Sequence, residues 1–316
     1  MMENLAIGID IGATNTKIGL VDSTARIREH ATISSQLDTV DPAPYLAAVN
    51  AVVEQYTNRY PVNGIGVALC SLVNAEHTGA LWAVNAPALN HLNIQQAFAT
   101  RFGCPVQVLN DVVAYTIAEY ACGAGQGVKR LMCLALGTGL AIAAMINGRV
   151  IETWGGVSAD AARIILEPGA EVRCKADIQG AAEALCGTAY IERLARARYP
   201  RRRVTAREVI AASRDGSDPM ACQVMAEIGG HVGHLLALLS PIFFPQKILI
   251  TGGTAEAGEP LFQAVREQYA HLIGAYMNSL AILENGAARP VEIWKAGLGP
   301  EAAIIGCAWS FLQPQA

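Results

Sequence analysis

Three glycine-containing turns that each follow an apolar run are the first candidates for chemistry in this sequence of 316 residues. They are Asp10-Ile11-Gly12-Ala13-Thr14, Leu136-Gly137-Thr138-Gly139 and Ile250-Thr251-Gly252-Gly253-Thr254. Glycine lets backbone N–H groups approach a ligand closely, and threonine hydroxyls add donors, so such turns suit phosphate oxygens. One turn of this kind is typical of an ordinary hairpin or strand-to-helix connection. Three of them, with a carboxylate beside the first, favour phosphate binding.

These turns match neither of two common phosphate-binding motifs. No G-x-G-x-x-G opens a helix after the first strand, and the sequence contains no G-x-x-x-x-G-K-[ST] loop. The first turn instead joins two apolar strands, predicted near 5–11 and 16–22.

A second acid, Asp111, follows an apolar run and opens a helical pattern. Its side chain is suited to cap that helix, and the positive helix end is expected to keep the carboxylate ionised. An ionised, oriented carboxylate also accepts the proton of a hydroxyl that attacks a γ-phosphate, because phosphoryl transfer needs mainly positioning and charge stabilisation. Both roles, helix cap and general base, stay open for Asp111.

The segments that position these residues alternate between strands and helices. Further strands are predicted near 27–34, 64–69, 106–109, 131–136, 140–146, 149–153, 247–251 and 291–295. Helices are predicted near 44–60, 94–102, 112–122, 182–199, from 205, and near 218–239, 260–274 and 302–311. This order predicts an α/β protein whose sheets are covered by helices.

The chain length suggests two domains. Residues 7–21 and 134–146 share the order strand, glycine turn, strand, and each opens its own α/β set. We therefore predict two related domains with a boundary near residue 112. Residues 1–112 with 297–316 form the N-terminal α/β domain, and residues 113–296 form the C-terminal one.

Composition argues against several classes of protein. The chain is 52% hydrophobic and 16% charged, which is typical of a folded core, and its net charge of -4 argues against a nucleic-acid partner. Eight cysteines without a CxxC pair, and no signal peptide, predict reduced thiols in a cytoplasmic protein. The longest uncharged stretch, 131–148, is interrupted by Gly137-Thr138-Gly139, which predicts two strands rather than a membrane span.

The sequence resembles the ROK family (repressors, open reading frames and kinases), within the superfamily of sugar kinases, actin and the Hsp70 ATPase domain. The resemblance covers nearly the whole chain and rests on four segments in order: GIDIGATNTKIGLVD, LNDVVAY, LALGTGLAIAAMINGRV and KILITGGTAEAG. It implies two ribonuclease-H-like (actin-like ATPase) domains with an interdomain cleft. The first phosphate loop and the sugar side belong to the N-terminal domain, and the second phosphate loop and the adenosine side to the C-terminal one.

The resemblance also implies an activity, ATP-dependent phosphorylation of a sugar hydroxyl on a hexose, amino sugar or derivative. Asp111 is then the general base, ATP and Mg²⁺ are the cofactors, and Asp10 contacts the Mg²⁺ indirectly. The residues matched to the nucleotide are Asp10, Gly12, Thr14, Gly137, Thr138, Gly139, Gly252 and Gly253. The residues matched to the sugar are Asn85, Asn110, Asp111, Asp160, Arg163 and Glu183.

One part of the family pattern is missing. Family members usually carry a histidine three residues after the acid matched by Asp160, and then zinc cysteines as CxCGxxGC. Here Arg163 replaces the histidine, Cys174 matches the first cysteine, and Ala176 and Ala181 replace the other two. One thiol without an imidazole does not make a tetrahedral site, so no structural zinc is expected.

The replacement by Arg163 leaves two interpretations open. A guanidinium beside the sugar pocket favours an anionic substrate such as a sugar acid or phosphosugar. Alternatively, Arg163 pairs with a local acid such as Asp160 or Glu167 and replaces the metal as a structural tie. The second interpretation is preferred.

Three classes of function remain to be compared. Only six residues precede Ile7, which leaves no room for the helix-turn-helix of family repressors and favours a kinase that binds sugar and ATP but no nucleic acid or membrane. A catalytically silent sugar- or nucleotide-binding or regulatory protein, without a DNA-binding domain, is the alternative. The oligomeric state is open, with a homodimer among the alternatives.

Overall fold

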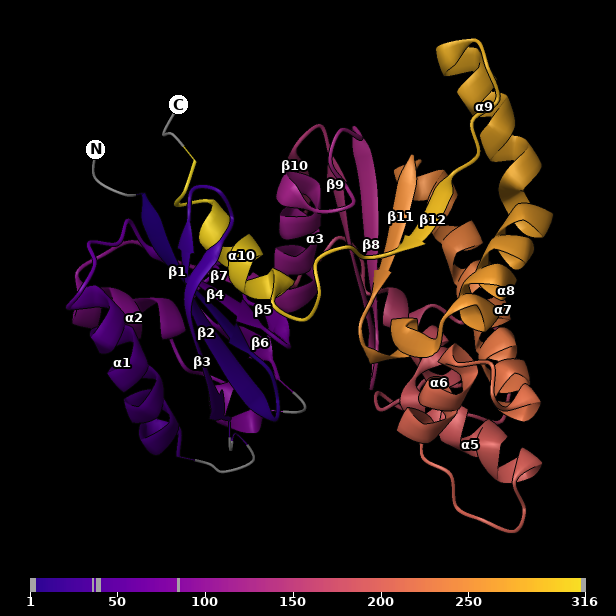
Figure 1. The fold of residues 1–316 in the computed structure, drawn as a ribbon, viewed down its shortest axis with the longest axis horizontal. Helices are drawn as coiled ribbons and strands as arrows, with labels where there is room; N and C mark the ends of the chain where they lie inside the picture. The colour runs from indigo at the N-terminus through magenta and orange to yellow at the C-terminus, as the bar shows by residue number, and fades with distance from the viewer. Residues whose placement is uncertain (1–3, 36, 38–40, 84–85, 314–316) are drawn as a thin grey trace. The chain divides into compact units, whose positions relative to one another are not determined.

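The computed structural model describes residues 4–35, 37, 41–83 and 86–313, and the chain divides into two compact units. Unit 1 comprises residues 1–127, 148–159 and 297–316, and unit 2 comprises residues 128–147 and 160–296. Figure 1 shows the course of the chain through both units.

Unit 1 contains a sheet with helices on both faces. Its strands are β1 (Leu5–Ile11), β2 (Asn15–Asp22), β3 (Ile27–Ser34), β4 (Ile65–Leu69), β5 (Leu72–Val73), β6 (Ala80–Trp82), β7 (Val106–Asn110) and β10 (Arg149–Ile151). Its helices are α1 (Ala43–Thr57), η1 (Pro87–Leu89), α2 (Ile94–Phe102), α3 (Asp111–Cys122) and α10 (Ala302–Trp309). The main sheet has the strand order β3-β2-β1-β4-β7, in which β1, β4 and β7 are parallel.

The alternation of side chains along β1 places different residues on the two faces of this sheet. Ile7, Ile9 and Ile11 pack in the core with α1 and α2, whereas Ala6 packs against α10 on the other face (Figure 1). Gly8 is required there because a Cβ at this position would lie 2.0 Å from the Ile304 carbonyl oxygen of α10. The sheet is therefore covered on both faces and leaves its strand ends for a site.

Unit 2 repeats this arrangement with a larger helical part. Its strands are β8 (Arg130–Leu136), β9 (Leu140–Ile146), β11 (Lys247–Thr251) and β12 (Glu292–Lys295). Its helices are η2 (Ala161–Arg163), α4 (Ala182–Cys186), α5 (Thr188–Arg198), α6 (Ala206–Arg214), α7 (Pro219–Phe243), η3 (Gly253–Ala257), α8 (Glu259–Tyr269), η4 (Ala270–Gly274) and α9 (Ala275–Asn285). The starts predicted for α6 and α7 are confirmed by the capping box of Thr205 with Glu208 and by the N-cap Asp218 before Pro219.

The two sheets share one topology. In unit 2 the neighbouring strands run β9-β8-β11-β12, antiparallel at the hairpin and parallel after it, as do β2-β1-β4-β7 in unit 1. The stretch 131–148 thus forms two strands around a glycine turn. Among the described residues, no helix combines the length and apolar character that a membrane crossing requires. All eight cysteines are free.

The division into units differs from the domains predicted from the sequence. Residues 113–127 and 148–159 belong to unit 1 rather than to the C-terminal part. The reason for the first difference is the close packing of α3 on α10, where a Cβ on Gly306 would lie 1.7 Å from the Ala114 carbonyl oxygen. An internal packing contact of this kind has no signal in local composition.

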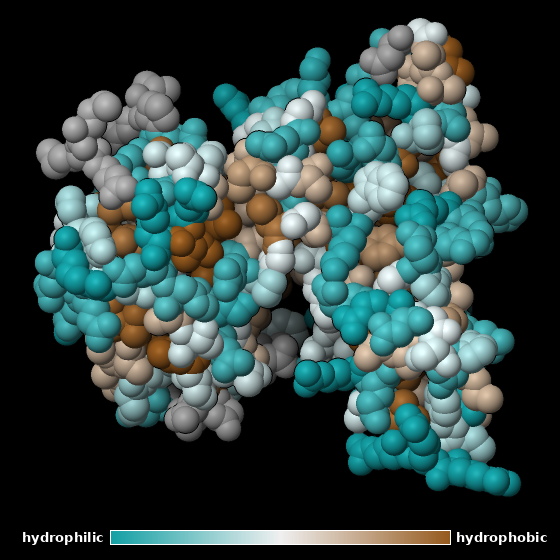
Figure 2. Space-filling model, viewed as in Figure 1, coloured by the Kyte–Doolittle hydropathy of each residue, from teal (hydrophilic) through white to brown (hydrophobic). Residues whose placement is uncertain are grey.

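One further element differs from the predicted one. The helix expected to end at Gly274 continues through the π-helical turn η4 into α9, because Gly274 keeps helical dihedral angles and the left-handed cap comes only at Gly286. The run Arg201-Arg202-Arg203 lies exposed in the turn between α5 and α6, where Figure 2 shows hydrophilic surface at the lower right.

Candidate active site

The carboxyl ends of three parallel strands in unit 1 are in register. Ile11 of β1 pairs with Leu69 of β4, which in turn pairs with Asn110 of β7. Because parallel strands end at the same edge of a sheet, this register brings Asp10 and Asp111 to one edge, although they are far apart in sequence. Ligands of open α/β sheets bind at this edge.

The first glycine turn connects β1 to β2 at that edge. It is closed by a hydrogen bond of 3.1 Å from Gly12 N to the Asn15 carbonyl oxygen. Residues 13–15 are exposed. The turn therefore presents its backbone to solvent beside the carboxylate of Asp10.

Lys17 belongs to this site and was missed in the sequence. It faces Asp10 across the hairpin, with Nζ 4.0 Å from Asp10 Oδ2, and it donates a hydrogen bond of 2.5 Å to the Pro300 carbonyl oxygen. The pairing could have been predicted from the sequence, because a tight turn at residues 12–15 fixes Asp10 and Lys17 as cross-strand partners. Lys17 brings a cation to the edge where phosphate binding was predicted.

The cap of helix α3 is Asn110, not Asp111. Asn110 Oδ1 accepts a hydrogen bond from Val112 N at 2.9 Å, and its Nδ2 donates to the Ser71 carbonyl oxygen at 2.8 Å. Asp111 is the first helical residue, and its Oδ1 also accepts from Val112 N at 2.8 Å. The helix thus keeps an N-cap whatever the side chain of Asp111 does.

Electrostatics distinguish these two carboxylates from surface acids. Burial raises the pKa of Asp10 to about 6, against the opposing charge of Lys17. Burial and the nearby charge of Asp10 raise the pKa of Asp111 to about 7, against the hydrogen bond from Val112 N. The helix end was expected to keep the carboxylate of Asp111 ionised, but desolvation outweighs the helix end and raises the pKa to about 7.

Unit 2 brings its glycine turns together at the corresponding edge of its own sheet. Gly252, with φ of 91°, lies so close to the end of β8 that a Cβ would be 2.3 Å from the Leu136 carbonyl oxygen. Thr188 N at the start of α5 donates to the Gly137 carbonyl oxygen at 3.1 Å. No atom lies within 4 Å of the Cβ positions of Gly137 and Gly253, so both turns have open space beside them.

The acids matched to the sugar side cluster next to the turn at Gly137–Gly139. Arg163 Nη1 lies 2.7 Å from Glu183 Oε1, and its Nε lies 3.6 Å from Asp160 Oδ2. The other oxygen of Glu183 lies 2.7 Å from the Cβ position of Gly139, so a larger residue at position 139 would displace the Glu183 carboxylate. Arg163 pairs with Asp160 and Glu183, whereas Glu167 pairs with His231.

The residues around Cys174 do not fit a structural zinc. The donor set is one thiol, which Arg163 hydrogen-bonds, and the described residues contain no group of three or more His, Cys, Asp or Glu suited to a metal ion. The loop is closed by other means. Cys174 N donates to Ile178 O at 3.1 Å, Gly180 N donates to Val172 O at 2.9 Å, and the Arg173 side chain donates to Asp177 O at 2.7 Å.

We expect Arg163→Ala to lower the melting temperature clearly, because it leaves Glu183 and Asp160 without their partner. Arg193→Ala is the matched control, since Arg193 of α5 and its partner Glu171 are both exposed and surface pairs contribute about 0–1 kcal/mol. A chelator is expected to leave the wild-type melting temperature unchanged. Elemental analysis that finds about one zinc per chain would contradict this account of the loop.

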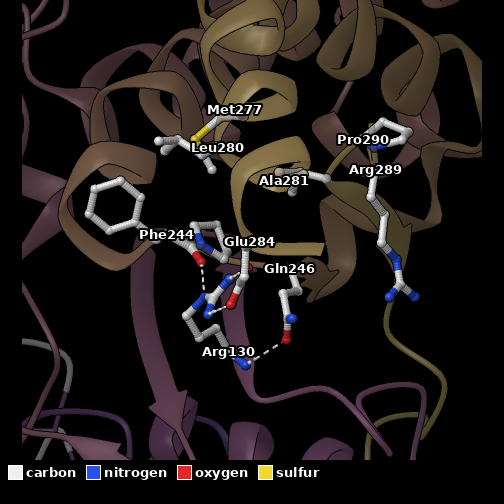
Figure 3. Close-up of a pocket in the computed structure, with 11 residues that line it drawn as sticks. Arg130, Phe244, Gln246, Met277, Leu280, Ala281, Glu284, Arg289 and Pro290 are labelled. Atoms are coloured by element: carbon white, nitrogen blue, oxygen red, sulfur yellow. Dashed lines mark hydrogen bonds and ion pairs between the residues drawn. The ribbon is translucent and has the colours of Figure 1, made fainter. Parts of the chain in front are cut away.

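Not every predicted residue is placed. Asn85 lies outside the described residues. The pocket in Figure 3, lined by Arg130, Gln246, Met277, Glu284 and Val291 among others, lies at the start of β8, β11 and β12. It is therefore at the sheet edge opposite to the glycine turns of unit 2. Its Arg130 is held by Glu284 through two hydrogen bonds of 2.8 and 2.9 Å.

Two sheets of one topology, each with glycine turns at the ends of its parallel strands, define the actin-like ATPase fold. Comparison with known families identifies one family within this fold class. The model of the ROK family matches residues 6–313, so the chain belongs to the ROK family.

Several relatives cover most of the chain. Glucokinase of Streptomyces coelicolor is 26% identical over 96% of this chain and 96% of its own length. The crystal structure of a ROK family glucokinase from Streptomyces griseus in complex with glucose and AMPPNP is similar with a TM-score of 0.79 and 26% identity, over 96% of this chain and 98% of that one. The DNA-binding transcriptional dual regulator NagC of Escherichia coli is 25% identical over 82% of this chain and 66% of its own length. Relatives therefore include both kinases and regulators.

Proposed function

We propose that the protein is an ATP-dependent carbohydrate kinase, in which Asp111 is the general base. The observation that carries the proposal is the place of Asp111. It stands at the strand edge beside Asp10 and the first glycine turn, with its pKa raised to about 7. A base with a pKa near the working pH combines a large ionised fraction with a useful driving force for proton transfer.

Each group of the site has a separate role in the proposed reaction. The sugar oxygen attacks the γ-phosphorus, its proton passes to a carboxylate oxygen of Asp111, and the bond to the β-phosphate oxygen breaks to release ADP. The exposed turn at residues 12–15 and the cation of Lys17 suit the phosphate chain. Mg²⁺ bound with ATP would neutralise charge on the phosphate oxygens, and the carboxylate of Asp10 is an oxygen group of the type that Mg²⁺ prefers.

The sugar side is proposed to involve Asp160, Glu183 and Arg163, together with Asn110 and Asn85. Arg163 is bracketed by two carboxylates, so this cluster carries a formal charge of one negative rather than an excess positive charge. Anionic substrates would be repelled, whereas carboxylates accept hydrogen bonds from sugar hydroxyls. The cluster therefore favours an uncharged sugar over a sugar acid or phosphosugar.

A coupled assay of ADP release over hexoses, amino sugars, N-acetylhexosamines, sugar acids and phosphosugars tests the proposal. Turnover is expected with at least one uncharged sugar, and little with sugar acids. If none of these compounds is turned over while an ATP analogue still binds, the protein is a catalytically silent binding or regulatory member of the family. A preference for sugar acids would contradict the assigned role of Arg163.

The raised pKa of Asp111 predicts a pH dependence of kcat/KM. The base must be ionised, so kcat/KM is expected to rise about tenfold per pH unit below the pKa and to level off above about pH 7. Since the charge of Asp10 contributes to the shift, Asp10→Asn should move the inflection to lower pH, whatever it does to the rate itself. The check is a profile from about pH 5 to pH 9. A flat profile over this range would argue against Asp111 as the base.

A further inference from the structure

Ser35, which follows β3, makes two hydrogen bonds to the first glycine turn. Its backbone N–H donates to the Thr14 carbonyl oxygen at 2.9 Å, and its hydroxyl donates to the Gly12 carbonyl oxygen at 2.7 Å. Two carbonyl groups of the turn, those of Gly12 and Thr14, are thereby fixed by one residue.

The hydroxyl of Ser35 is the end of a buried chain. Thr16 Oγ1 lies 2.9 Å from Ser35 Oγ and 2.7 Å from the hydroxyl oxygen of Tyr45 in α1. Thr16 and Ser35 are fully buried, and Tyr45 is 6% exposed. The three hydroxyls therefore have one another and the turn as partners, in a place where an unmade hydrogen bond is costly.

The direction of every bond in this chain follows from its last acceptor. A carbonyl oxygen only accepts, so the proton of Ser35 Oγ points to Gly12. Ser35 Oγ must then accept from Thr16, and Thr16 must accept from Tyr45. Burial also raises the pKa of the Tyr45 hydroxyl, which keeps its proton in place as the first donor. Such chains strengthen their members cooperatively.

This arrangement determines which backbone groups of the turn stay available. The carbonyl groups of Gly12 and Thr14 are engaged by Ser35, whereas Ala13 and Thr14 are exposed. In the part of the chain that the structure describes, no backbone hydrogen bond uses the N–H of Ala13 or of Thr14. These two N–H groups are therefore left for a ligand, whereas the carbonyl groups of Gly12 and Thr14 are engaged by Ser35.

We propose that the Tyr45–Thr16–Ser35 chain is a positioning device that orders the 12–15 turn for the phosphate groups of a nucleotide. The proposal rests on the proposed function for the identity of the ligand. The ordering of the turn itself is independent of that function. None of the three residues touches the ligand, and each acts through the turn.

The test compares Ser35→Ala with a matched control in unit 2. Ser240 is also fully buried, donates to the Leu236 carbonyl oxygen at 2.9 Å, and lies 2.9 Å from the hydroxyl of Tyr269. Ser240→Ala therefore removes a buried serine that likewise links a hydroxyl to a carbonyl oxygen, from a site between two helices. Any general cost of losing a buried serine hydroxyl appears in both variants.

Amide hydrogen exchange of the nucleotide-free protein is the first measurement. Ser35→Ala should speed exchange of the amides of Gly12 and residue 35, whose hydrogen bonds to the Asn15 and Thr14 carbonyl oxygens close the turn and attach it to the chain after β3. Ser240→Ala should leave the exchange of both amides unchanged. In kinetics, Ser35→Ala should raise the KM for ATP about tenfold, the equivalent of one lost hydrogen bond, with little change in the KM for the sugar. Equal exchange in the two variants, or an unchanged KM for ATP, would overturn the proposal.

Tyr45→Phe provides a milder variant if Ser35→Ala does not fold. It deletes only the first donor and leaves the bond of Ser35 to Gly12, so we expect a smaller effect of the same kind. A larger effect of Tyr45→Phe than of Thr16→Val would contradict the direction of the chain. If the wild type binds no ATP analogue, the proposed function fails, and the exchange data still decide whether the chain orders the turn.

Discussion

Asp111→Asn is expected to lower kcat by about 10²-fold or more, the usual contribution of a positioned general base. Asparagine has nearly the same size but accepts no proton from the attacking hydroxyl. The affinity for an ATP analogue should stay close to that of the wild type, because the turns that suit the nucleotide are unchanged. Steady-state kinetics and calorimetric binding with AMPPNP measure the two effects separately.

The same variant should not lose stability, for two structural reasons. Asn110 caps the helix, so the cap survives the change. The raised pKa of Asp111 also means that its ionised form is disfavoured in the folded protein, so ionisation lowers the free energy of unfolding as the pH rises from about 4 to about 7. Asp111→Asn should therefore melt at or above the wild-type temperature at pH 8, with a difference that shrinks toward pH 5. A rate within a few-fold of wild type would remove Asp111 from the mechanism.

Gly252→Ala should strongly destabilise the fold of unit 2. Gly252 has φ of 91° and ψ of 172°, a region that is essentially restricted to glycine, and a Cβ would lie 2.3 Å from the Leu136 carbonyl oxygen. Strain of this kind costs about 1–3 kcal/mol, and the overlap with backbone adds to it. We expect a clear drop in the denaturation midpoint and a loss of nucleotide binding.

Gly253→Ala is the control on the neighbouring residue. The Cβ position of Gly253 has no atom within 4 Å, so the ligand-free protein should keep its denaturation midpoint. If nucleotide lies against this turn, the same variant should still weaken AMPPNP binding, because the methyl group occupies the open space. Equal midpoints for Gly252→Ala and wild type would show that the turn adapts freely, against the packing described here.

Much of the fold could be predicted from the sequence because its signals are local. The alternation of apolar strands and helices, the glycine turns and the cap at Thr205 each follow from neighbouring residues. The end of α9 and the unit to which α3 belongs could not be predicted, since they depend on the geometry of Gly274 and the packing of Gly306 against Ala114. The presence of a glycine in the sequence does not show whether it continues a helix, ends a helix or allows close packing.

The candidate site also combines features that follow from the sequence with features that only the structure shows. The order of the motifs singled out Asp10, Asp111 and the glycine turns, because each stands in or directly after the last residues of a strand. Lys17 could have been added from the hairpin register alone. The helix cap on Asn110, the raised pKa of Asp111 and the hydroxyl chain behind the turn depend on burial and on distances between segments. No local pattern contains that information.

The central claim is that the protein moves the γ-phosphoryl group of ATP to a sugar hydroxyl. Mass spectrometry of the products, after incubation with ATP, Mg²⁺ and the sugar that gives the fastest ADP release, tests it most directly. The account predicts a sugar monophosphate in equal amount to ADP, formed by the wild type and nearly absent with Asp111→Asn. ADP without a sugar phosphate, or a sugar phosphate formed equally by both proteins, would contradict it.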